Sequence, residues 1–159
     1  MQIRDAIVGD APAACQVLRQ SIEQLCEADH RNDPVTLARW LSNKTAANVA
    51  SWIARPDNSL LLAVENETVL AVGAVTDAGE ITLNYVAPNA RFCGVSRTLL
   101  AALEARAVQR GNLRCTLTST ETAHRFYRAR GYVGDGPPDH KYGMEGGYPM
   151  SKALAAQGT

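Results

Sequence analysis

The spacing of apolar residues predicts a helical first third of the chain. A short strand-like segment at residues 3–4 comes first, and from residue 10 to about 26 apolar residues recur every three or four positions, as on one face of an amphipathic helix. Residues 29–34 are polar and predict a loop. Two further helices are predicted, one with an apolar stripe over residues 37–41 and one over residues 48–55.

The middle of the chain has the pattern of β-strands. An apolar run at residues 59–64, a second strand-like run at residues 69–75 and an alternating run at residues 80–86 are connected by short turns at residues 65–67 and 77–79. Because turns of this length join neighbouring strands, the three runs predict an antiparallel meander.

The final third returns to helices and strands in alternation. A helix with an apolar stripe from Leu99 to Ala107 ends at Gly111, and a strand follows at residues 114–118. Thr120 begins a second predicted helix that runs to Arg130. The chain is then rich in Gly and Pro up to Gly147, and residues 148–154 predict a last strand at the edge of the sheet. We expect one domain over residues 1–159.

Composition restricts the classes of function. The chain has 159 residues, of which 46% are hydrophobic, enough for a buried core. Its sixteen basic and sixteen acidic residues cancel, which removes the main electrostatic argument for a nucleic-acid partner. The longest apolar run, residues 60–64, is too short to cross a membrane. Cys15, Cys26, Cys93 and Cys115 show no metal-ligand spacing, so we expect reduced thiols, no metal and a cytoplasmic location.

The junction between the third predicted strand and the following helix is suited to binding phosphate. The segment Arg91–Ser96 leads directly into the helix, whose first amides lack intrahelical partners and carry partial positive charge. Gly94 permits a close approach to the backbone, and Arg91 and Arg97 add cationic donors. Taken alone, the same pattern also fits an ordinary strand-to-helix turn with solvated arginines.

Two segments resemble a known family. Tyr85–Pro88 followed by Arg91-x-x-Gly94-x-Ser96 resembles the acetyl-CoA signature of the GCN5-related N-acetyltransferase (GNAT) superfamily, and Ala123–Tyr132 resembles a later segment of the same family. The resemblance implies a mixed α+β (α/β) fold with a central, mostly antiparallel sheet of about six or seven strands and helices on both faces. Two departures are Ser96, where Gly or Ala is usual, and Thr120, where Asn is frequent.

The resemblance also implies a cofactor and the residues that contact it. The cofactor is acetyl-CoA, with its pyrophosphate at the start of the helix and the Val86 amide as a donor to its thioester or pantetheine part. The implied cofactor-binding residues are Tyr85, Val86, Arg91, Phe92, Cys93, Gly94, Val95, Ser96, Arg97, Thr98, Thr120, Ala123 and Tyr127.

Two residues are candidates for proton transfer. Tyr127 is the candidate acid for the leaving thiolate, although it also fits a core aromatic residue. Tyr127 is expected about seven residues into its helix. The side chains of Phe126 and Tyr127 are about 100° apart around the helix axis, so one should pack in the core and the other should face the cleft. Glu80 is the candidate base, although its place after Asp77–Gly79 is better explained by a solvated hairpin end.

The acceptor is less defined by the sequence. Asn84 and His30 are candidate substrate-binding residues, and His30 also fits an ordinary polar loop. We expect acetyl transfer to a primary amine of a small molecule or peptide. Two alternatives stay open, namely a non-catalytic acyl-CoA-binding or sensing module of the same fold and an unrelated nucleotide-binding α/β domain. The sequence also leaves open a homodimer formed through the C-terminal strands.

Overall fold

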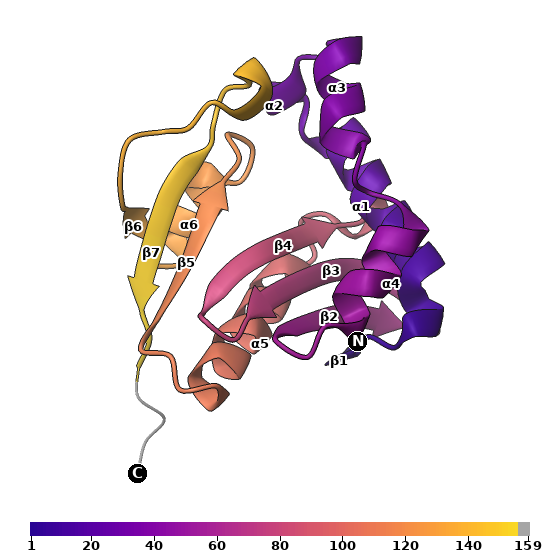
Figure 1. The fold of residues 1–159 in the computed structure, drawn as a ribbon, viewed down its shortest axis with the longest axis vertical. Helices are drawn as coiled ribbons and strands as arrows, with labels where there is room; N and C mark the ends of the chain where they lie inside the picture. Colours follow the sequence, from indigo (N-terminus) through magenta and orange to yellow (C-terminus); the bar gives the residue numbers. More distant parts are fainter. Residues whose placement is uncertain (156–159) are drawn as a thin grey trace.

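A computed structural model describes residues 1–155 and contains a seven-stranded sheet in the order β1-β2-β3-β4-β5-β7-β6 (Figure 1). All neighbouring strands are antiparallel except β4 and β5, which run parallel. The predicted meander and the mostly antiparallel mixed fold are therefore confirmed. The strands are β1 (Gln2–Asp5), β2 (Asn58–Glu65), β3 (Thr68–Thr76), β4 (Glu80–Val86), β5 (Arg114–Ser119), β6 (Val133–Gly134) and β7 (Tyr148–Ala153).

Helices cover both faces of the β2–β4 part of the sheet. In Figure 1, α5 lies behind these strands, whereas α1 and α4 lie on the opposite side. β3 is accordingly buried at five successive positions, residues 71–75. Helix α5 packs so closely on this strand that a Cβ at Gly73 would lie 2.8 Å from Leu103 Cδ1. The helices are α1 (Ala11–Leu25), α2 (Glu27–His30), α3 (Pro34–Leu41), α4 (Ala46–Ala54), α5 (Val95–Gln109) and α6 (His124–Ala129), with 3-10 turns η1 (Val8–Asp10), η2 (Pro88–Ala90) and η3 (Lys141–Gly143).

The parallel strands β4 and β5 separate soon after they meet. Their ladder contains only the pairs Glu80–Thr116 and Ile81–Leu117. Beyond this point β4 stays paired with β3 as far as Val86, while β5 follows β7 to Ser119. The two halves of the sheet therefore open like a V, which is visible between β4 and β5 in Figure 1.

Three expectations about elements are corrected. β7 is an inner strand because β6, only two residues long, pairs with its outer side and forms the edge. Residues 27–30, partly assigned to a polar loop, form the short helix α2. The helix expected from Thr120 begins at His124, after a turn over residues 120–123. Within residues 1–155, no helix has both the length and the apolar character needed to cross a bilayer.

Candidate functional site

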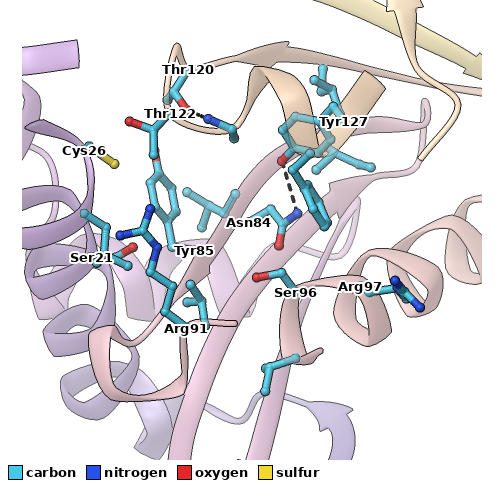
Figure 2. A pocket seen from close by; sticks show the side chains of 18 of the residues that line it. Ser21, Cys26, Asn84, Tyr85, Arg91, Ser96, Arg97, Thr120, Thr122 and Tyr127 are labelled. Atoms are coloured by element: carbon cyan, nitrogen blue, oxygen red, sulfur yellow. Dashed lines mark hydrogen bonds between the residues drawn. The ribbon is translucent and has the colours of Figure 1, made fainter. Parts of the chain in front are cut away.

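A cleft of about 440 Å³ occupies the opening between β4 and β5. Its walls come from both strands, the start of α5, the end of α1 and the first part of α6 (Figure 2). The structure brings most of the expected cofactor-binding residues together here, and only Cys93 and Thr98 of that set lie outside the lining. Those that line the cleft are Tyr85, Val86, Arg91, Phe92, Gly94, Val95, Ser96, Arg97, Thr120, Ala123 and Tyr127.

The start of α5 presents free amides to the cleft. Gly94 is the N-cap residue and has a left-handed backbone (φ 76°), which glycine adopts without strain. No side chain caps the helix there. The first intrahelical bond is donated by the Thr98 amide to the Gly94 carbonyl at 3.2 Å, so the amides of residues 95–97 have no intrahelical acceptor. This helix start is an open cradle for an anion.

The register of β3 and β4 directs another amide into the opening. The Ala87 amide donates to the Leu70 carbonyl at 2.8 Å, which makes the facing residues Val86 and Ala71 a non-hydrogen-bonded pair. The N–H of Val86 therefore points away from β3. Because β5 has already separated from β4, this donor faces the cleft instead of a neighbouring strand.

Tyr127 lines the cleft with a buried ring. Its ring is buried against Phe126 and Tyr132, with ring centroids 5.3 and 5.6 Å away. Asn84 Nδ2 donates a hydrogen bond to the Tyr127 hydroxyl oxygen at 3.1 Å, as drawn in Figure 2. Burial raises the pKa of Tyr127 to about 12, although the bond from Asn84 opposes this shift. The hydroxyl thus keeps its proton at neutral pH.

The position of Tyr127 differs in two ways from expectation. Because α6 begins at His124, Tyr127 lies in its first turn instead of about seven residues into the helix. Phe126 and Tyr127 also both line the cleft, so they do not divide between core and cleft. The buried member of the pair is Tyr127, whose ring belongs to the hydrophobic core while its hydroxyl reaches the cleft.

A buried carboxylate holds the wall of the cleft between β5 and α6. Asp29, only 3% exposed, accepts hydrogen bonds from the amides of Glu121 and Thr122 at 2.7 and 3.1 Å and from Thr122 Oγ1 at 2.6 Å. Within the same turn, Thr120 Oγ1 accepts from the Ala123 amide at 3.1 Å. Thr120 therefore stabilises this turn and does not cap α6 as expected, because the N-cap residue of α6 is Ala123 and no side chain caps it. Asp29 joins α2 to this turn, 92 residues away.

The candidate substrate-binding residue His30 and the candidate base Glu80 also lie outside the cleft. His30 is buried, its Nδ1 accepts from the Asn32 amide at 3.0 Å, and Nε2 consequently donates to the Ile22 carbonyl at 2.8 Å. Both ring nitrogens are occupied, so the expected substrate-binding role of His30 is corrected to a structural one. Glu80 is exposed where β4 still pairs with β5, outside the cleft, and this position does not support a role as base.

Several lining residues were not predicted from the sequence. They come from the end of α1, the inner part of the strands and α6, and include Ser21, Cys26, Thr82, Thr118, Thr122 and Arg130. Burial raises the pKa of the Cys26 thiol to about 12, so this thiol is protonated at neutral pH. Within residues 1–155, no three His, Cys, Asp or Glu side chains are grouped as metal ligands would be.

Solved structures with the same fold were found in comparisons. A GCN5-related N-acetyltransferase from Rhodopseudomonas palustris is 24% identical with a TM-score of 0.84, and 96% of this chain and 95% of that chain are covered. A PaiA N-acetyltransferase from Thermoplasma acidophilum, in complex with coenzyme A, is 18% identical with a TM-score of 0.83 over 96% and 98% of the chains. An aminoglycoside 6'-N-acetyltransferase complexed with coenzyme A is 14% identical with a TM-score of 0.72, and both chains are covered fully.

The sequence comparisons assign the family. No curated protein matches the chain significantly. A family profile described as an acetyltransferase (GNAT) domain, by contrast, matches residues 18–154, which include the V-shaped opening, the start of α5 and Tyr127. Because the matched residues make up most of the chain, the chain belongs to the family of acetyltransferase (GNAT) domains.

Proposed function

We propose that this protein is an N-acetyltransferase that transfers an acetyl group directly from acetyl-CoA to a primary amine of a small molecule or peptide. The observation that carries this proposal is the convergence, in one cleft, of three kinds of donor. These are the free amides at the start of α5, the Val86 amide that faces away from β3, and the Tyr127 hydroxyl.

The residues at the start of α5 fit the phosphate groups of coenzyme A. A pyrophosphate accepts hydrogen bonds from free helix amides, and the partial positive charge at the helix start favours its negative charge. A Cβ at Gly94 would have no atom within 4 Å, so the backbone is open to a ligand at this point. Ser96 and Arg97 line the same side of the cleft and provide further donors.

The remaining donors suit acetyl transfer. When bound, acetyl-CoA supplies an acetyl group as a thioester, and its transfer requires a polarised carbonyl and a proton for the thiolate. The Val86 amide is the donor for the carbonyl oxygen. The Tyr127 hydroxyl is the proton donor, because its oxygen already accepts from Asn84 Nδ2 and its own hydrogen stays available.

Calorimetry with acetyl-CoA and thiol release across an amine panel test the proposal. We expect binding, and thiol release that depends on an added amine. Tyr127→Phe should lower kcat by about 100-fold, which is a typical contribution of general acid catalysis, and leave acetyl-CoA affinity nearly unchanged. Tyr148→Phe is the matched control, since the Tyr148 hydroxyl binds exposed Glu121 and lies outside the cleft.

The results separate the alternatives. Absence of acetyl-CoA binding at high concentration would contradict any CoA-dependent function. Binding without amine-dependent thiol release would instead favour a non-catalytic acyl-CoA-binding module. Equal kcat values for the Tyr127→Phe variant and the wild type would refute the role of this hydroxyl as the acid.

A further inference from the structure

We propose that the amine accepted by this protein also carries a carboxylate, which binds between the guanidinium of Arg91 and the hydroxyl of Ser21. This inference rests on the proposed function and adds the chemical class of the acceptor. It follows from two polar groups that lie on the α1 side of the cleft, opposite the start of α5 (Figure 2).

The first group is the hydroxyl of Ser21. Ser21 lies in α1 and is only 3% exposed as a residue. Its Oγ makes no hydrogen bond to another residue within 1–155, yet it is not among the fully buried polar atoms that lack a partner, so it stays accessible from the cleft that Ser21 lines. In Figure 2 this oxygen points from α1 into the cleft, toward Arg91. A hydroxyl that is accessible from the cleft can donate to, or accept from, a ligand bound there.

The second group is the guanidinium of Arg91. In Figure 2 the side chain of Arg91 extends past the ring of Tyr85 toward Ser21 and Cys26, whereas Arg97 points away on the opposite side. The charge of Arg91 acts on the Cys26 thiol, where it opposes the increase in pKa that burial causes. Arg91 is therefore directed toward α1 and not toward the start of α5, so the proposed role of its side chain differs from the expected cofactor contact.

The contacts of Arg91 leave its donors available. The guanidinium carbon lies 4.6 Å from the centroid of the Phe92 ring, a cation–π contact with the face of the group. Such a contact does not use the N–H groups at the edge of the guanidinium, which form the planar fork that matches a carboxylate. Within residues 1–155, no Asp or Glu forms an ion pair with Arg91.

The position of this pair suits one end of an acceptor. Tyr85 lies between the Arg91–Ser21 pair and Asn84, and its ring offers an apolar surface for the stem of a substrate. A carboxylate held by Arg91 and Ser21 leaves the opposite end of the molecule directed toward Asn84 and Tyr127. The amine is thus oriented by a charge-assisted contact at the far end.

Matched pairs of acceptors test the inference on the unmodified protein. Amino acids and short peptides are compared with their C-terminal carboxamides, which keep the amine and the shape but lose the negative charge. We expect kcat/KM to be roughly tenfold or more higher for the carboxylates. Equal kcat/KM values within the pairs would overturn the inference and leave acetyl transfer intact, whereas silence toward every amine would instead contradict the proposed function.

Variants then assign the preference to the two residues. Arg91→Gln should raise KM for the carboxylate acceptor about tenfold and reduce the preference over the carboxamide, with little change in acetyl-CoA affinity. Ser21→Ala should act in the same direction more weakly. Arg97→Gln, which removes the same charge on the opposite side, should leave the preference intact. If Arg91→Gln weakens acetyl-CoA binding and keeps the preference, Arg91 serves the cofactor and the inference is wrong.

Discussion

Replacement of Asp29 by alanine should destabilise the protein more than most single substitutions. The buried carboxylate accepts three hydrogen bonds, two of them from backbone amides that cannot turn elsewhere. Each buried donor that loses its acceptor costs about 1–3 kcal/mol. The Thr122 hydroxyl can rotate to another acceptor, so we expect a loss of about 3–4 kcal/mol in the free energy of unfolding, mainly from the two amides.

The loss should be visible in thermal and urea unfolding. For a chain of this length, each kcal/mol changes Tm by about 2–4 °C, so Asp29→Ala should lower Tm by roughly 6–16 °C. Asp29→Asn keeps one acceptor oxygen and should show an intermediate loss. Because the 120–123 turn forms part of the cleft wall, the affinity for acetyl-CoA should fall as well.

Asp33 provides the matched control. Its exposed carboxylate accepts from the amide and the hydroxyl of Thr36 at 2.9 and 2.7 Å, a similar set of bonds within one helix start. Water can replace these bonds, so Asp33→Ala should cost clearly less than Asp29→Ala. If the two variants lose equal stability, the burial of Asp29 and its link to the distant turn do not matter, and the reasoning is refuted.

Two further predictions concern stability. Gly146→Ala should destabilise the protein strongly, because the added Cβ would collide with the Glu121 amide. Gly143 has a similar positive φ but no atom within 4 Å of such a Cβ, so Gly143→Ala should show only the cost of backbone strain. Urea unfolding of both variants measures the difference in stability. Burial, and secondarily the charge of Lys141, lowers the pKa of Lys44 from 10.5 to about 8. The unfolded state then binds more protons between these values, so stability should rise from pH 8 to 10.5. Lys44→Met should remove this rise and stabilise the protein by about 1–2 kcal/mol at pH 7, and equal unfolding curves at pH 7 and 10 in the wild type would contradict the assignment.

The parts of the site that depend on local sequence were predictable. Gly94 follows a strand and precedes a strong helix, and this order alone indicates free amides at a helix start. The Val86 donor, by contrast, was expected only from the resemblance to the GNAT family, and in the structure its N–H faces away from β3. Periodicity also predicts most of the core, because Leu99, Leu103 and Ala107 recur on one face of α5 and are buried there.

Contacts between distant segments were not predictable in the same way. Asp29 and His30 are polar residues after a helix, a pattern that indicates a solvated loop unless their partners are known. Those partners include a turn 92 residues away. The inner position of β7 likewise depends on β6, whose two residues fall in a Gly- and Pro-rich segment without any strand period. Neither arrangement leaves a signal in the residues next to it.

Ser21 is an intermediate case, and it shows which signal in the sequence was available. It lies three residues after Leu18 and four before Leu25, so a helix places it on the same apolar stripe. A polar side chain on a buried stripe requires a hydrogen-bond partner. The fold supplies none within residues 1–155 but does open a cleft beside the hydroxyl. Such a hydroxyl is available to a ligand in the cleft, which is the physical reason to look for the acceptor at this end.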